Sequence, residues 1–100
     1  MNTFQLIYEL ITQIPVGKVT TYGTIAKKLG LTNPRIVGYA LHANKNPQTY
    51  PCHRVVNKNG ELAPGYAFGG ATIQEQILKQ EQVVLLDEKR VNLAKSFHQF

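Results

Sequence analysis

Apolar side chains recur every three or four positions over the first fourteen residues, which is the spacing of one face of an α-helix. The recurring residues are Phe4, Ile7, Ile11 and Ile14. Asn2 followed three positions later by Gln5 resembles a capping box, and Pro15 cannot continue a helix. We therefore predict a first helix over residues 3–14, followed by a turn and a short extended piece over residues 16–19.

A second helical pattern follows, with four apolar residues at positions i, i+3, i+4 and i+7. These are Tyr22, Ile25, Ala26 and Leu29. Gly30 is placed to end this helix in a left-handed conformation. Asn33 is a good N-cap and Pro34 a good first residue for a third helix that reaches about Ala43. Two short helices joined by a tight turn that contains glycine predict a helix-turn-helix.

The third helix has an apolar face and a face for contact with a partner. The apolar face consists of Ile36, Val37, Ala40 and Leu41. Arg35 lies in the first turn on the other side, and Gly38 nearby keeps the helix surface low enough to approach a groove in DNA closely. The alternative is a solvated arginine without a specific role, which is common for exposed arginines.

The second half of the chain alternates short apolar segments with turn residues. Residues 55–56, a turn over 57–60 and residues 61–62 predict a small β-hairpin, which forms a wing beside the helix-turn-helix. Residues 63–71 are too rich in Gly and Pro for regular structure. The predicted fold class is mainly α with small β-hairpins, a winged helix-turn-helix DNA-binding domain.

One more helix and one more hairpin are expected towards the end of the chain. Thr72 with Glu75 forms a capping box for a helix that ends near Glu81 or Gln82. Its apolar residues are Ile73, Ile77 and Leu78. Residues 83–86 and 90–93 flank a polar turn and predict a terminal β-hairpin.

The charge balance indicates a polyanionic partner. Eleven Lys and Arg residues against six Asp and Glu residues give a net charge of +5, so nucleic acid is the first partner class to consider. A chain of 100 residues suits a single domain over residues 1–100. No apolar run approaches the roughly 20 residues of a membrane span, and the start of the chain lacks the features of a signal peptide. We expect a cytoplasmic monomer without a membrane partner.

Cys52 is the only cysteine, which excludes an internal disulfide and a cysteine-rich zinc site. It is followed directly by His53, and an imidazole can take the proton of a thiol to make a nucleophilic thiolate. Glu81 is a candidate partner that orients His53, by the logic of a catalytic triad. The simpler alternatives stay open, since a lone cysteine is often only buried and Glu81 can reach solvent at a helix end.

Residues 51–56, with the sequence PCHRVV, resemble the active-site motif of the O6-alkylguanine-DNA alkyltransferases. Other segments resemble this family in the same order along the chain. They are residues 16–23 before the second helix, residues 35–38 of the recognition helix, Asn46-Pro47 as an asparagine hinge, Tyr66 with Gly69-Gly70 in the substrate loop, and Gln80-Glu81 at the end of the last helix. The resemblance extends from residue 3 to about residue 85.

The resemblance implies a catalytic role for four residues. Cys52 accepts the alkyl group, His53 acts as its base through a water molecule, and Glu81 holds His53. Asn46 ties the recognition helix to the active-site strand. Neither a cofactor nor a metal is implied.

The resemblance also implies how damaged DNA is bound. Arg35 enters the duplex from the minor groove and fills the space of the extruded base, Tyr22 presses on a backbone phosphate, and Gly38 lies on the same recognition helix. An atom inside a duplex is out of reach until its nucleotide is flipped into a pocket. The residues expected to form that pocket are Tyr66, Pro51 and Val55.

The function implied is the irreversible transfer of an alkyl group from O6-alkylguanine in duplex DNA to Cys52, once per molecule. The alternative is a damage sensor, because the chain also resembles the short alkyltransferase-like proteins. Those proteins lack a separate N-terminal domain and recruit nucleotide excision repair proteins to alkylated DNA. Their tail resembles residues 87–100, but they typically carry Trp at the position of Cys52. An ordinary winged-helix module is the third interpretation, and it gives no reason for Cys52 beside His53.

Overall fold

Three helices from the first half of the chain pack against one another. In the computed structural model, which describes residues 2–63, 66 and 68–100, they are α1 (Thr3–Ile11), α2 (Tyr22–Leu29) and α3 (Arg35–His42). Their buried apolar residues belong to one core cluster that also contains Cys52 and Val55. The helical group therefore provides one side of the environment around Cys52.

The predicted start of the first helix is confirmed and its predicted end is three residues too late. The Asn2 side chain accepts a hydrogen bond from the backbone N–H of Gln5 at 2.8 Å. The helix ends at Ile11, and the next residues form turns, with the N–H of Ile14 donating to the carbonyl of Ile11 at 3.1 Å. Ile14 is nevertheless buried, so its apolar spacing marks the core beyond the end of the helix.

The helix-turn-helix over α2 and α3 is confirmed. Gly30 ends α2 with a φ of +72°, and Leu31 donates back to the carbonyl of Ala26 at 2.8 Å, as in a Schellman motif. The Asn33 side chain accepts from the backbone N–H of Arg35 at 3.0 Å and so caps the start of α3. The sequence places these two helices correctly because both caps are local signals.

The predicted hairpin over residues 55–62 is wrong in its pairing. Strand β2 (Val55–Val56) pairs in parallel with β1 (Thr20–Thr21), which lies directly before α2. The turn and short extended piece predicted within residues 16–19 are found, because the N–H of Lys18 donates to the carbonyl of Pro15 at 3.1 Å and Val19 forms a bridge with Phe97 directly before β1. All four strand residues are buried, so this strand pair belongs to the interior of the protein. A strand of a wing would instead be half exposed.

The turn expected between the two halves of that hairpin does form. Gly60 adopts a φ of +80° and donates to the carbonyl of Asn57 at 2.9 Å. A side-chain Cβ at this position would lie 2.5 Å from the carbonyl oxygen of Val91, so only glycine fits. Glu61 then forms an isolated antiparallel bridge with Arg90. The turn is thus attached to the last strand of the chain.

Helix α4 (Gly70–Gln80) begins two residues before the predicted capping box, so that Thr72 lies inside the helix. Glu75 does not cap the helix but forms an ion pair with Lys79 at 3.5 Å. The end of the helix agrees with the prediction, with Glu81 as its C-cap. The inner face differs by one position, because Gln74 is fully buried whereas Ile73 is 37% exposed.

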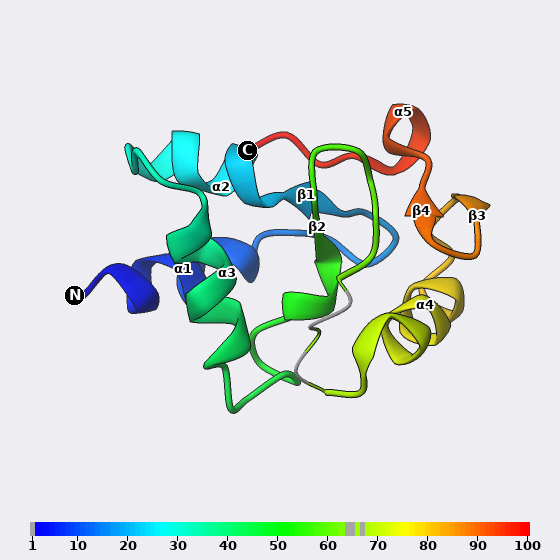
Figure 1. The fold of residues 1–100 in the computed structure, drawn as a ribbon, viewed down its shortest axis with the longest axis horizontal. Coiled ribbons are helices and arrows are strands. Elements are labelled where there is room, and N and C mark those ends of the chain that lie inside the picture. Colours follow the sequence, from blue (N-terminus) through cyan, green and yellow to red (C-terminus); the bar gives the residue numbers. More distant parts are fainter. Residues whose placement is uncertain (1, 64–65, 67) are drawn as a thin grey trace.

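The predicted terminal hairpin is confirmed as β3 (Leu85–Asp87) paired antiparallel with β4 (Arg90–Val91). A short helix that the sequence did not predict follows, α5 (Leu93–Ser96). The last residues run beside β1, since the N–H of His98 donates to the carbonyl of Val19 at 2.7 Å. Figure 1 shows the β1–β2 pair between the helical group and the α4 side of the molecule.

The fold class is confirmed as a small helix-rich domain with few strands. Among the described residues, none of the helices combines the length and apolar character that crossing a bilayer requires. The segment that contains Cys52 joins α3 to β2 and occupies a central position, because Cys52 and Val55 belong to the core cluster of the helices whereas Val56 belongs to a second cluster with Leu62 and Leu78. This central position determines which side chains surround Cys52.

Candidate functional site

The chain bends sharply just before Cys52, as expected from Pro51. Pro51 has φ −76° and ψ 68°, and the N–H of Cys52 donates to the carbonyl of Tyr50 at 2.7 Å, which is an inverse γ-turn. A single turn of 3-10 helix, η1 (Cys52–Arg54), follows and leads directly into β2. On a strand the side chains of Cys52 and His53 would point to opposite faces, and the 3-10 turn replaces that alternation.

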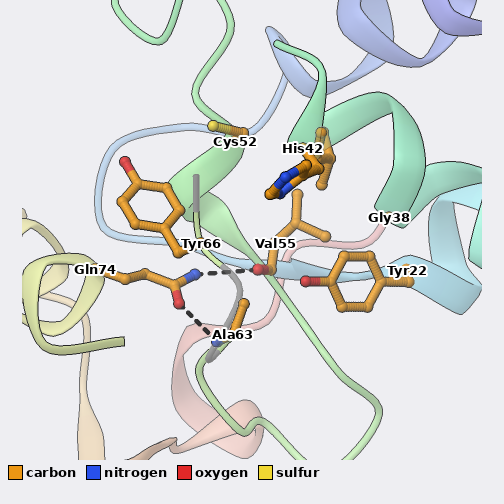
Figure 2. A pocket seen from close by; sticks show the side chains of 9 residues that line it. Tyr22, Gly38, His42, Cys52, Val55, Ala63, Tyr66 and Gln74 are labelled. Carbon is orange, nitrogen blue, oxygen red and sulfur yellow. Dashed lines mark hydrogen bonds between the residues drawn. The ribbon is translucent and has the colours of Figure 1, made fainter. Parts of the chain in front are cut away.

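Cys52 faces a cavity of about 40 Å³ beneath the helix-turn-helix (Figure 2). The lining residues come from α2, α3, the Cys52 segment, the segment after Leu62 and α4. They are Tyr22, Gly38, Leu41, His42, Cys52, Val55, Ala63, Tyr66 and Gln74. Five of the predicted site residues therefore meet at one cavity, namely Tyr22, Gly38, Cys52, Val55 and Tyr66.

Tyr66 was predicted to lie in the substrate loop. It is described in the structure, whereas residues 64, 65 and 67 beside it lie outside the described residues. It is buried, and its ring packs edge-on against Phe68 at a centroid distance of 5.7 Å. Burial, with smaller contributions from Cys52 and Glu81, raises the pKa of Tyr66 to about 12. Its hydroxyl is therefore protonated at neutral pH and able to donate a hydrogen bond.

His53 and Glu81 meet as expected, with 3.0 Å between the imidazole Nε2 and the carboxylate Oε2. Burial lowers the pKa of His53, and the opposing effect of Glu81 does not fully offset it. His53 is therefore neutral at neutral pH. A neutral imidazole that donates its Nε2 proton to a carboxylate keeps Nδ1 as an acceptor.

Arg54 completes this network, and the sequence reasoning missed it. Its guanidinium donates to both carboxylate oxygens of Glu81, from Nε at 3.0 Å and from Nη2 at 2.8 Å, and its Nη1 donates to the carbonyl of Ile14 at 2.9 Å. Burial alone would raise the pKa of Glu81, but the hydrogen bonds from Arg54 and His53 lower it overall. Glu81 is thus held as a carboxylate. The position of Arg54 directly after the Cys-His pair was the available signal.

The residue that connects α3 to the Cys52 segment is Asn44, which corrects the assignment to Asn46. Asn44 is buried, its side-chain amide donates to the carbonyl of Tyr50 at 3.0 Å, and it also hydrogen-bonds Cys52. Asn46 is exposed, and its side chain only accepts from the N–H of Thr49 at 3.3 Å. The Asn-Pro pair directed the sequence assignment to Asn46, although Asn44 lies nearer the end of α3.

At neutral pH the thiol of Cys52 is expected to be protonated. Burial raises the pKa of Cys52, and the hydrogen bond from Asn44 lowers it only in part. Its side chain is 4% exposed. A nucleophilic thiolate at this position therefore requires a base that removes the proton during the reaction.

Arg35 does not line the cavity and lies exposed on the outer surface of the helix-turn-helix. It borders a shallow groove of about 380 Å³ together with Tyr22, Pro34, Gly38 and Tyr39. Tyr22 and Gly38 line both the groove and the cavity. The outer surface of α3 is therefore continuous with the surroundings of Cys52. Pro51 is buried beside Cys52 but does not line the cavity, contrary to its assignment to the pocket.

A metal site finds no support in the part of the chain that the structure describes. Within residues 2–63, 66 and 68–100, no group of three or more His, Cys, Asp or Glu side chains could hold a metal ion. The cavity is lined by the thiol of Cys52 and by Tyr22 and Tyr66, whereas His53 follows Cys52 in sequence but does not line it.

Comparison with known proteins finds relatives for the part of the chain that contains the helix-turn-helix and Cys52. The family model of the 6-O-methylguanine DNA methyltransferase, DNA binding domain, matches residues 2–83. A methylated-DNA--protein-cysteine methyltransferase of Lodderomyces elongisporus is 46% identical over 77 residues, which are 75% of this chain and 37% of that protein. The protein of the same name from Methanocaldococcus jannaschii is 42% identical over 83 residues, which are 83% of this chain and 47% of that protein. The chain thus spans less than half the length of these relatives.

Solved structures give a similar result. The crystal structure of Schizosaccharomyces pombe Atl1 in complex with damaged DNA containing O6-carboxymethylguanine matches with a TM-score of 0.87 and 29% identity, over 100% of both chains. The crystal structure of Mycobacterium tuberculosis OGT in complex with DNA matches with a TM-score of 0.75 and 31% identity, over 82% of this chain and 49% of that one. From the residues around Cys52 and these matches together, we conclude that the chain belongs to the 6-O-methylguanine DNA methyltransferase family.

Proposed function

We propose that this protein binds duplex DNA through its helix-turn-helix and transfers an alkyl group from O6-alkylguanine to Cys52. The observation that carries the proposal is the position of Cys52 in the cavity beneath α2 and α3, with the neutral His53 next in sequence and held by Glu81. The net charge of +5 suits a polyanionic substrate. The relatives named above are methyltransferases of the same kind.

The chemistry is a single nucleophilic substitution. The Sγ of Cys52 attacks the alkyl carbon, a carbon–sulfur bond forms, and the carbon–O6 bond breaks. The electron pair of that bond stays on the purine, which takes up a proton at N1 and becomes guanine. The thiol proton passes to Nδ1 of His53, through a bridging water as the family resemblance implies, while Nε2 remains bonded to Glu81. The thioether has no route back to the thiol, so each molecule reacts once.

The cavity must widen before a purine can enter. At about 40 Å³ it has room for a few water molecules only. Tyr22 and Gly38 line both this cavity and the outer groove, so they mark the side from which a flipped base would enter. Flipping supplies the in-line access to the alkyl carbon that a stacked base denies.

A damage sensor is the second candidate, and two observations favour it. The Atl1 structure, which contains O6-carboxymethylguanine DNA, matches over the full length of both chains, including the terminal segment beyond the family match. Burial also raises the pKa of Cys52, so the thiol is not activated in the resting protein. In this alternative the protein holds the flipped lesion for other repair proteins without reacting.

Intact-protein mass spectrometry separates the two candidates. The protein is incubated with a duplex containing one O6-methylguanine, and with the same duplex containing guanine. We expect a gain of one methyl group per molecule with the damaged duplex only, located on Cys52 by peptide mapping and absent in Cys52→Ser. Tight binding of the damaged duplex without any gain in mass would overturn the transferase and support the sensor.

A further inference from the structure

The side chain of Gln74 is polar and fully buried, and it bonds to three backbone groups around the cavity. Its Nε2 donates to the carbonyl of His53 at 3.0 Å and to that of Val55 at 3.2 Å. Its Oε1 accepts from the N–H of Ala63 at 2.8 Å. Because a glutamine amide has two N–H donors, both are used here. Figure 2 shows this side chain between the β2 segment and Ala63.

These three backbone groups belong to two segments of the chain, both of which contribute lining residues to the cavity. His53 and Val55 lie within three residues of Cys52 on the segment that positions the thiol. Ala63 accepts a hydrogen bond at its carbonyl from the N–H of Tyr66 at 3.1 Å, so its position determines that of Tyr66. Gln74 is therefore a direct link between the segment that carries the thiol and the segment that carries Tyr66.

Helix α4 gives this link a rigid base. Gln74 and Glu81 are seven positions apart, which places them on the same face of the helix, although Glu81 itself is the C-cap. One end of this face holds His53 through Glu81, and the middle holds the backbone of the Cys52 segment and of Ala63 through Gln74. A single helix thus connects His53, the proposed proton acceptor, to the backbone around the cavity.

We propose that Gln74 is a positioning residue that sets the spacing between Cys52 and Tyr66, and so the fit of the flipped base. The inference rests on the proposed function only in taking the cavity as the place that receives the base. It applies equally to a transferase and to a sensor. Gln74 does not react, because its amide groups are all directed to the backbone.

The first test compares lesion preference in variants of α4. Dissociation constants for the O6-methylguanine duplex and the guanine duplex are measured in a Cys52→Ser background, so that no transfer disturbs the equilibrium. Gln74→Met keeps the volume but leaves three backbone groups unpaired, and we expect the preference for the lesion to fall about tenfold. Gln76→Met, at an exposed position of the same helix, is the matched control and should keep the preference of the parent.

Gln74→Glu gives a signature that loss of structure alone would not produce. The protonated side chain still accepts from Ala63 and donates to one carbonyl, whereas the carboxylate faces the carbonyls of His53 and Val55 without a donor. Burial favours the protonated form. Lesion preference in this variant should therefore be close to that of the parent at low pH and fall as pH rises, while the parent shows no such step.

Two measurements without DNA keep the inference independent of the proposed function. The amide hydrogen of Ala63 should exchange slowly in the unmodified protein, and iodoacetamide should modify Cys52 about tenfold faster in Gln74→Met than in Gln76→Met. Fast exchange at Ala63, or an unchanged lesion preference and thiol reactivity in folded Gln74→Met, would overturn the role of Gln74. A wild-type protein with no lesion preference would instead overturn the proposed function and leave these two measurements to decide on Gln74.

Discussion

His53 and Glu81 contact each other at 3.0 Å although 28 positions separate them in the chain. The contact brings the 3-10 turn after Pro51 to the C-terminal end of α4. Glu81 also accepts two hydrogen bonds from Arg54, so one carboxylate serves an imidazole and a guanidinium together. The orientation of the proposed base therefore depends on a charged network rather than on one pair.

Replacing Glu81 should affect both transfer and stability. Glu81→Gln leaves the guanidinium of Arg54, whose side chain is only 14% exposed, without its anionic partner. We expect the free energy of unfolding to fall by about 1–3 kcal/mol, the range for lost hydrogen bonds to charged groups. Urea denaturation measures this loss, and methyl transfer should also slow because His53 is held less firmly.

Glu75→Gln is the control for this change on the same helix. Its partner Lys79 is 59% exposed, and exposed ion pairs contribute little. The two variants lose the same formal charge. Equal losses of stability in both would show that the Glu81 network has no special role.

The rate of methyl transfer should fall in acid with a midpoint below pH 6.5. His53 acts as a base only when it is neutral, and burial lowers its pKa from 6.5. The rate is therefore retained as pH falls through the ordinary range of histidine and is lost only at the lower, folded-state pKa. Single-turnover rates between pH 5 and pH 8 measure the midpoint. A midpoint above 6.5 would contradict the neutral, buried His53.

The lowered pKa of His53 also makes the stability of the fold depend on pH. The unfolded chain takes up a proton at the ordinary pKa of histidine, before the folded protein does so. Between pH 6.5 and the lower folded-state pKa, His53 therefore destabilises the fold progressively as pH falls. The lowered pKa of Glu81 acts in the same direction at still lower pH, since its carboxylate is stabilised only in the folded state. Urea midpoints in His53→Gln should show a weaker decline between neutral pH and pH 5.

Asn44 and Asn46 offer a matched pair of substitutions. Asn44→Ala removes the hydrogen bonds to Tyr50 and Cys52, so we expect slower methyl transfer by about tenfold, from the cost of one or two buried hydrogen bonds. Asn46→Ala removes one exposed contact to Thr49 and should leave the rate within about twofold. The opposite order of effects would restore Asn46 as the hinge.

Arg35→Ala should weaken binding of the lesion more than binding of undamaged DNA. Filling the vacated stack is needed only when a base is flipped, and unstacking costs a few kcal/mol. We expect at least a tenfold loss of lesion preference by fluorescence anisotropy. Lys28→Ala, which removes another exposed positive charge at the end of α2, should lower both affinities together. Parallel losses in both variants would make Arg35 an ordinary phosphate contact.

Much of the helical part could be predicted from the sequence because its signals are local. Gly30 and Asn33 determine where α2 ends and α3 begins through bonds to neighbouring residues. The pairing of β2 could not be predicted, because its partner β1 lies 35 positions earlier and nothing near Val55 specifies it. The nearby turn at residues 57–60 favoured a hairpin instead. The residues of a turn therefore predict the turn itself, but not which strand pairs with β2.

Site residues could be predicted where they belong to a sequence motif. The prediction failed for residues whose role depends on packing. Cys52 and His53 are adjacent, and Glu81 stands where the last helix was expected to end. Gln74 was overlooked because a polar residue in a polar helix normally faces solvent. Its spacing of four positions from the buried Leu78 was the signal that it belongs to the inner face.

The bonds of Arg54 also bear on when the site exists during folding. Arg54 contacts the carbonyl of Ile14, 40 positions before it, and the carboxylate of Glu81, 27 positions after it. Contacts between such distant positions form only after the intervening loops have closed. Until that stage Cys52 is an accessible thiol with an ordinary pKa of about 8.5 and no organised base. An incompletely folded molecule is thus open to oxidation at Cys52 before it is able to act on DNA.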